Sequence, residues 1–149
     1  MKKVMHLSVI LIFITLTSAM AEAPVWHENF DEAIAAAKET NKPILLNFSG
    51  SDWCIWCKRL NQEVLSQQAF KDYAKDNLVL ALADFPKGKT QTKALQDQNN
   101  ALAQKYGVRG FPTVVLVASD GKLLAQTGYV KGGAENYVTH LKELLAPKK

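Results

Sequence analysis

The chain has 149 residues, of which 48% are hydrophobic, and this length and composition predict one globular domain with a single core. The formal net charge of +4 includes Lys2 and Lys3; without them 16 lysines and arginines face 14 acids, a net charge of +2. The sequence contains no basic stripe with interleaved aromatic residues, so nucleic-acid binding has no support.

The first 21 residues have the three parts of a secretory signal peptide. Lys2 and Lys3 form a basic n-region, residues 4–17 contain no Asp, Glu, Lys or Arg, and Ala19 and Ala21 form an A-x-A cleavage site. We therefore expect cleavage after Ala21, a single mature domain over residues 22–149, and a periplasmic or extracellular location. An uncleaved membrane anchor is the alternative, because the uncharged stretch approaches the minimum spanning length of about 18 residues.

The first half of the mature chain predicts a helix, a strand, a second helix and a second strand. Residues 29–40 show helical spacing of apolar side chains, and residues 44–48 have strand composition. Turn residues then lead into a helical pattern that starts at Trp53, breaks at Ser66 and continues over residues 69–75. Residues 78–83 form a near-continuous apolar run, as expected of a strand buried on both faces.

The second half predicts a short helix, a hairpin and a final helix. The polar segment 84–100 predicts a solvated loop, with a rim for docking a protein as the alternative, and residues 101–106 complete a short helix that stops at Gly107. Pro112 precedes a strand over residues 113–118, a place where a cis X-Pro bond can occur. A turn over residues 119–122 joins it to a strand over residues 122–127, and an amphipathic helix follows and ends before Pro147.

The two cysteines, Cys54 and Cys57, lie where a predicted strand leads into a predicted helix. Positions i and i+3 of a helix are about 5 to 6 Å apart, which suits a disulfide. Unpaired N–H groups and the helix dipole stabilise a thiolate at a helix start, so we expect Cys54 to be the nucleophile and Cys57 the resolving thiol. Export would place this pair in a compartment where disulfides form and persist.

A C-x-x-C pair also allows half of a zinc site or a purely structural disulfide. Zinc requires four ligands, and the histidines are widely scattered at positions 6, 27 and 140. A disulfide that closes a loop of four residues stabilises little. Redox chemistry is therefore favoured, with no metal and no cofactor other than the redox-active disulfide itself.

The order of elements resembles the thioredoxin fold, an α/β fold with a central mixed β-sheet flanked by helices on both faces. Residues 53–58, Trp-Cys-Ile-Trp-Cys-Lys, are similar to the family's W-C-x-x-C-K active site, and residues 106–113 resemble the segment that carries its cis-proline. More narrowly, residues 49–54, 83–86 and 128–133 resemble exported bacterial thioredoxin-like proteins related to the C-terminal domain of the transmembrane disulfide reductase.

The resemblance implies a thiol-disulfide oxidoreductase that acts on cysteines of exported proteins through mixed disulfides, as a reductase or isomerase. It implies Pro112 against Cys54, the backbone of Phe111 paired with an extended substrate segment, and Trp53, Ile55 and Trp56 around the sulfurs. The expected partners are protein thiols or disulfides and a membrane electron donor, and we expect a monomer. The alternative is a non-catalytic thioredoxin-fold module for redox sensing or protein binding, and ordinary core packing is the alternative for the aromatic residues.

Two features depart from the family pattern: the residue at position 47 and the pair of residues between the cysteines. Asn47 stands where thioredoxin has a buried acid that moves the proton of the resolving thiol, so we hypothesise that Cys57 is deprotonated through water or by Asp52 or Glu63. Ile55 and the residue after it match neither the Gly-Pro of reducing thioredoxins nor the Pro-His of oxidases. Because no charged or histidine neighbour stabilises the Cys54 thiolate further, a reducing or reshuffling role is favoured.

Overall fold

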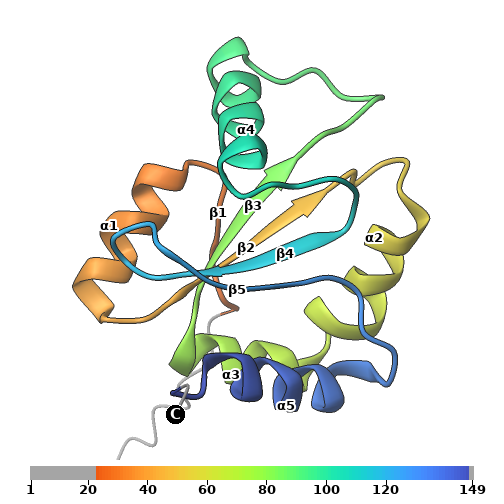
Figure 1. The fold of residues 1–149 in the computed structure, drawn as a ribbon. Helices are drawn as coiled ribbons and strands as arrows, with labels where there is room; N and C mark the ends of the chain where they lie inside the picture. Colours follow the sequence, from red (N-terminus) through yellow and green to blue (C-terminus); the bar gives the residue numbers. More distant parts are fainter. Residues whose placement is uncertain (1–22, 148–149) are drawn as a thin grey trace, which may run out of the picture.

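The computed structural model describes residues 23–147, so the predicted signal peptide over residues 1–21 lies outside the described residues. Five strands form one sheet in the order β1-β3-β2-β4-β5 (Figure 1). Both β1 and β2 run parallel to β3, whereas β4 runs antiparallel to β2 and β5. The strands are β1 (Trp26–His27), β2 (Ile44–Ser49), β3 (Val79–Asp84), β4 (Thr113–Val117) and β5 (Leu123–Thr127). The predicted α/β class with a mixed sheet is confirmed.

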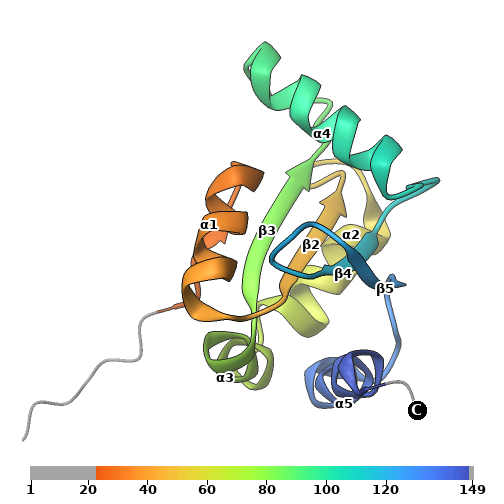
Figure 2. The same cartoon turned by 60° about the vertical axis from the view of Figure 1, so that its left-hand side comes forward.

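Helices cover both faces of this sheet (Figures 1 and 2). One face packs against α1 and α4, and the other packs against α3, α5 and the helix that begins after the first cysteine. The helical segments are α1 (Phe30–Thr40), α2 (Ile55–Leu60), the π-helical turn η1 (Asn61–Leu65), α3 (Gln68–Asn77), α4 (Lys93–Lys105) and α5 (Gly133–Leu145). The helices on both faces of the sheet are therefore confirmed, as the predicted thioredoxin fold requires. The predicted break in the helix near Ser66 is also confirmed, because η1 ends at Leu65 and α3 begins at Gln68.

Strand β2 lies at the centre of the sheet, and all six of its residues are buried. Successive side chains of a strand point to opposite faces. Ile44, Leu46 and Phe48 accordingly pack in the core under α1 and α4, whereas Leu45 packs in the core under α3 and α5. Asn47 shares the face of Leu45, so this strand places a polar amide on the same side of the sheet as α2.

Two elements differ from the sequence-based expectation. Helix α4 begins at Lys93, eight residues before the predicted start, and Thr92 caps it by accepting a hydrogen bond from the Leu95 N–H at 3.3 Å. An ion pair between Lys93 and Asp97 adds i,i+4 support on its exposed face. The expectation of a loop through residue 100 was wrong because α4 buries only Asn99 and Leu102 fully, which leaves its apolar periodicity weak.

Strand β1 was not predicted, since two residues carry no periodic pattern.

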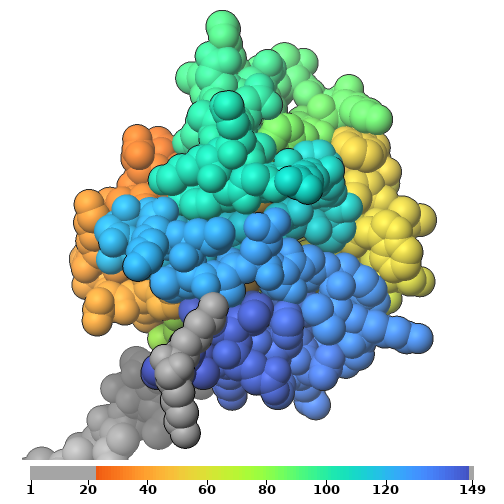
Figure 3. Space-filling model, viewed as in Figure 1, coloured from red at the N-terminus to blue at the C-terminus, as the bar shows by residue number. Residues whose placement is uncertain are grey.

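The carboxyl end of β2, the start of α2 and the start of β4 meet at one end of the sheet. Residues 50–54 connect β2 to α2, and Thr113 at the start of β4 pairs with Phe48 near the end of β2. In the space-filling view, α2 and its flanking turn (yellow) lie at one edge of the molecule, beside the segment that leads into β4 (Figure 3). This arrangement brings residues 50–54, which include Cys54, close to the segment that leads into β4, more than 50 residues later in the sequence.

Candidate active site

Cys54 is the N-cap residue of α2, and its sulfur takes the place of a capping oxygen. Its backbone is extended (φ −80°, ψ 110°), its N–H donates to the carbonyl of Gly50 at 2.8 Å, and its Sγ accepts from the N–H of Cys57 at 3.2 Å. The helix thus starts at Ile55, two residues later than the pattern predicted. A backbone N–H aimed at the sulfur from a helix start favours the thiolate of Cys54 over its thiol.

The two cysteines are joined in a disulfide with a Cα–Cα distance of 5.2 Å. Both are nearly covered, Cys54 at 6% exposure and Cys57 at 4%. The residues around them are open to solvent instead, with exposures of 41% for Trp53, 74% for Ile55 and 49% for Trp56. The disulfide therefore lies at the base of an exposed apolar surface.

Trp53 joins the cysteine turn to the loop after β3. Its indole N–H donates to the carbonyl of Phe85 at 2.8 Å, and the Lys87 ammonium lies 4.1 Å above its ring. A Cβ atom at position 50 would lie 2.5 Å from the Trp53 ring, so the glycine there allows the indole to lie flat against the turn. The side chain of Trp53 is thereby fixed beside Cys54.

Phe111 and Pro112 approach the cysteine turn from the segment before β4. The Phe111 ring contacts the Trp53 ring edge to face at 6.0 Å and packs against Phe85 at 5.0 Å. The peptide bond between Phe111 and Pro112 is cis, and Thr113 donates from its hydroxyl to the carbonyl of Gly110 at 2.7 Å. The structure therefore brings the two sequence-predicted segments together through an aromatic contact.

Trp56 has a different set of neighbours, which the sequence did not predict. Its ring lies 5.5 Å from the ring of Tyr129, and the Arg59 guanidinium lies 5.2 Å from its centre. Glu63 connects these partners, because it pairs with Arg59 at 3.1 Å and accepts a hydrogen bond from the Tyr129 hydroxyl. That hydrogen bond to the carboxylate raises the pKa of Tyr129. The motif at residues 128–133 was the available signal for Tyr129, but nothing in it indicated a contact with Trp56.

Asp52 anchors the loop after β3. Its carboxylate accepts from the N–H groups of Lys87 at 3.1 Å and Gly88 at 2.6 Å, and these hydrogen bonds lower the pKa of Asp52. Glu63 is occupied by Arg59 and Tyr129, as described above. The two acids that were considered as proton acceptors for Cys57 therefore have other partners.

A cavity of about 410 Å³ lies behind Cys57, on the side of the sheet that faces α2. Cys57 lines it together with the polar residues Asn47, Ser49, Ser51, Asn61 and Gln62. Asn47 is 6% exposed, and its Oδ1 has no hydrogen-bond partner in the described part of the chain. A buried amide oxygen without a partner is uncommon because it costs free energy.

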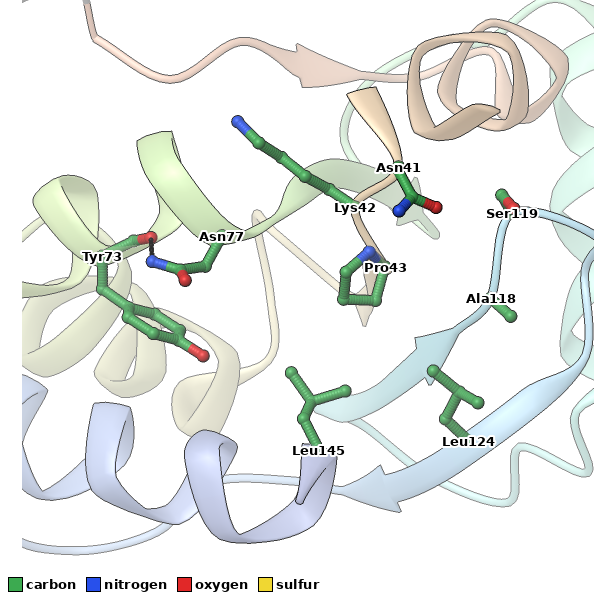
Figure 4. Close-up of a pocket in the computed structure, with 9 residues that line it drawn as sticks. All are labelled: Asn41, Lys42, Pro43, Tyr73, Asn77, Ala118, Ser119, Leu124 and Leu145. Atoms are coloured by element: carbon green, nitrogen blue, oxygen red, sulfur yellow. Dashed lines mark hydrogen bonds between the residues drawn. The ribbon is translucent and has the colours of Figure 1, made fainter. Parts of the chain in front are cut away.

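A second hollow, of about 460 Å³, lies at the opposite end of the sheet (Figure 4). Pro43 before β2, Ala118 after β4 and Leu145 at the end of α5 contribute to it, and its lining includes no cysteine, histidine or carboxylate. Between residues 23 and 147, no group of three or more His, Cys, Asp or Glu side chains could hold a metal ion. No helix of this part of the chain is long and apolar enough to cross a membrane.

Comparisons with known proteins agree with this geometry. A model of the thioredoxin-like domain family matches residues 30–144. The disulfide bond reductase DsbH of Chlamydia pneumoniae is 36% identical over 129 residues, which cover 87% of this chain and 78% of that protein. A solved structure of a DsbH oxidoreductase superposes with a TM-score of 0.80 at 35% identity and covers 91% of this chain and 94% of that one.

The C-terminal domain of DsbD from Neisseria meningitidis, solved in its oxidised form, is similar with a TM-score of 0.57 and 26% identity, covering 76% of this chain and 90% of that one. These relatives agree with the narrower resemblance that the motifs predicted. The chain therefore belongs to the thioredoxin superfamily, and its paired Cys54 and Cys57 make it a thiol-disulfide oxidoreductase of that superfamily.

Proposed function

We propose that this oxidoreductase reduces disulfides in exported proteins through a two-step exchange at Cys54 and Cys57. The observation that carries the proposal is the position of Cys54 at the start of α2. Its sulfur accepts a hydrogen bond from the Cys57 N–H and lies beneath exposed apolar side chains. Such a sulfur ionises readily and can be reached by a partner that covers the surrounding apolar surface. Cys57 lies within α2 and lines the cavity behind the disulfide, which suits a thiol that reacts only with its neighbour.

In the first step, the Cys54 thiolate attacks one sulfur of a partner disulfide. That disulfide breaks, a Cys54–partner mixed disulfide forms, and the second partner sulfur leaves as a thiolate that takes up a proton. Cys57 then loses its proton, attacks the sulfur of Cys54 and releases the remaining partner sulfur. The partner gains two electrons, and the enzyme is left with the Cys54–Cys57 disulfide, which an external dithiol must reduce again.

The partner would be bound by the exposed side chains that surround the sulfurs. We assign Trp53, Ile55 and Trp56 to apolar contacts, and the Phe111 backbone and Pro112 to pairing with an extended partner segment. Aromatic side chains that are half exposed and held in place by their neighbours bind partners at a small cost in conformational entropy. The contact of Phe111 with Trp53 supports the assignment of both groups to the same partner.

The reducing direction is supported by the surroundings of Cys54 and by a relative. Within the part of the chain that the structure describes, the hydrogen-bond donor to the Cys54 sulfur is a backbone N–H, and no cation or histidine donates to it. A weakly stabilised thiolate is a better reductant than a strongly stabilised one. The similar Chlamydia protein is called a disulfide bond reductase.

Export after cleavage at Ala21 places the enzyme where its substrates would be. The basic n-region, apolar stretch and A-x-A site support this step, and the mature protein would be the single domain of residues 22–149, acting as a monomer. The resemblance of residues 49–54, 83–86 and 128–133 to exported relatives of the transmembrane disulfide reductase supports a membrane protein as the electron donor. No metal or organic cofactor takes part in the proposed reaction.

Trapping tests the proposed exchange. The reduced mature protein should accelerate reduction of insulin by a dithiol, the Cys57→Ser variant should accumulate a one-to-one mixed disulfide, and the matched Cys54→Ser variant should form none. Mass spectrometry under non-reducing conditions distinguishes these species. A wild-type protein that does not accelerate reduction, with neither variant trapped, would instead indicate a non-catalytic binding module.

A further inference from the structure

The lining of the cavity behind Cys57 includes none of the side chains assigned above to partner binding, namely Trp53, Ile55, Trp56, Phe111 and Pro112. Its volume is about 410 Å³, which is room for several water molecules, and five of its ten lining residues carry a side-chain amide or hydroxyl, beside the apolar Trp26, Leu65 and Leu82. A polar cavity of this size is expected to be hydrated, whereas an apolar one would stay dry. Its contact with Cys57 puts water beside the thiol that must lose a proton.

Asn47 gives this cavity an unpaired acceptor. Its Oδ1 is buried and has no partner in the part of the chain that the structure describes, although β2 holds the residue rigidly between β3 and β4. An unpaired buried oxygen costs free energy, so its retention indicates a partner that is present in another state or is a solvent molecule. The Cys57 thiol of the reduced protein and cavity water can both donate to it.

The charged and titratable groups around Cys57 leave water as its proton acceptor. These groups are Asp52 before α2, Lys58 and Arg59 on α2, Glu63 on η1, Asp84 at the end of β3, and Tyr129 before α5. Each carboxylate accepts hydrogen bonds elsewhere: Asp52 from the loop amides, Glu63 from Arg59 and Tyr129, and Asp84 from the N–H and hydroxyl of Ser51. Lys58 is the one charged residue among the described residues that line the cavity, and its ammonium donates to the carbonyl of Asp52.

We propose that the cavity behind Cys57 is a water site that accepts the Cys57 proton, with Asn47 as the residue that positions the thiol and the water. In the reduced protein the Cys57 thiol donates to Asn47 Oδ1 or to a water bound there. When the mixed disulfide forms, the proton passes from the thiol to cavity water and out to bulk solvent. The resulting thiolate attacks Cys54, so the S–S bond to the partner breaks and the Cys54–Cys57 bond forms.

The proposal rests on the proposed function and concerns its second step. An aromatic disulfide that releases one coloured thiolate per step reports both steps in a single stopped-flow experiment. The first release measures attack by Cys54, and the second measures resolution by Cys57. We expect the wild-type resolution rate to rise about tenfold per pH unit until the thiol itself is ionised, without an inflection from a carboxylate.

Substitutions at Asn47 should act on the second release alone. Asn47→Leu removes the acceptor and fills part of the cavity. We expect the resolution rate of Cys57 to fall by about tenfold, which corresponds to the loss of one hydrogen bond, while the rate of attack by Cys54 is unchanged. Asn47→Ser keeps an acceptor and should retain more of the rate. Asn47→Asp should add an acid-side inflection to the pH profile. Asn99→Leu, at a buried asparagine outside the cavity, is the matched control and should leave both releases unchanged.

Equal resolution rates in the wild type, Asn47→Leu and Asn47→Ser would overturn the proposal. A carboxylate inflection that is already present in the wild type would overturn it as well, since an acid would then be the acceptor. Loss of the first release in the wild type would contradict the proposed function instead. The two failures are therefore distinguishable, and Asn47→Asp keeps the test valid if Asn47→Leu does not fold.

Discussion

The two sets of residues around the Cys54–Cys57 disulfide differ in polarity and in exposure. The front side is apolar, aromatic and exposed, with Trp53, Ile55 and Trp56 open to solvent. The other side is the cavity that Cys57 lines, where the buried Asn47 oxygen has no partner among the described residues and side-chain amides and hydroxyls alternate with the apolar Trp26, Leu65 and Leu82. The difference suggests that the exposed aromatic side binds the partner, whereas the cavity side accepts the proton of the Cys57 thiol. Substitutions on the two sides should then change different measured quantities.

The largest expected effect is a difference in the free energy of unfolding between substitutions at two buried asparagines, Asn99 and Asn47. Asn99 donates to the carbonyl of Asp84 at 2.9 Å and accepts from Gln98 at 3.0 Å, so Asn99→Leu should lower the free energy of unfolding by about 1–3 kcal/mol. Asn47→Leu removes an unpaired oxygen and should leave that free energy equal or higher. Urea denaturation of the oxidised proteins measures both. An equal loss in the two variants would mean that Asn47 serves stability.

The next largest effect concerns the front side. Trp56→Ala removes a half-exposed ring that contacts Tyr129 and Arg59, so we expect the KM for a protein substrate to rise about tenfold with kcat nearly constant. Leu123→Ala is the control, because this exposed leucine lies on β5, beside the end of β4 that is remote from the cysteines. A fall in kcat alone would indicate that Trp56 acts on the chemistry.

A smaller effect should follow from loss of the indole hydrogen bond of Trp53. Trp53→Phe keeps an aromatic ring but removes the donor to the Phe85 carbonyl, so we expect the free energy of unfolding to fall by about 1 kcal/mol. Trp56→Phe is the control, since the indole nitrogen of Trp56 forms no hydrogen bond within residues 23–147. Equal stability of the two variants would show that the Phe85 contact contributes nothing measurable.

The smallest effect is a pH dependence at Asp52. The amides of Lys87 and Gly88 lower the pKa of Asp52 from its ordinary value of 3.8, so its ionised form stabilises the folded loop above about that pH. The contribution should disappear as the pH falls through the lowered value in the folded state. Hydrogen exchange of the Gly88 amide measures it, and its protection should decrease in acid. In Asp52→Asn, protection should be lower at neutral pH and should not change further in acid.

The sequence predicted the features that depend on local pattern. The buried run of β2, the turn after it and the C-x-x-C pair at the start of α2 together indicated the fold and the site. Helix α4 was predicted too short, because its first two turns are polar and held by a cap and an ion pair rather than by apolar spacing. The same local reasoning located Cys54 one residue from the observed helix start.

The remaining features of the site depend on contacts between distant segments. Trp56 meets Tyr129 only because α2 and the segment before α5 lie side by side, and Asp52 meets Gly88 only because the loop after β3 folds over the turn. The departure at Asn47 was visible in the sequence. Its unpaired oxygen and the cavity beside it were not, since both depend on what the neighbouring strands and α2 leave empty.

The reduction potential of the Cys54–Cys57 pair is the most direct test of a reducing function. It is obtained by equilibrating the mature protein with a dithiol and disulfide buffer and quantifying the oxidised fraction. A backbone N–H as the principal stabiliser of the Cys54 thiolate predicts a value near that of thioredoxin, about −270 mV. A value near about −120 mV, that of a strong oxidase, would contradict the account.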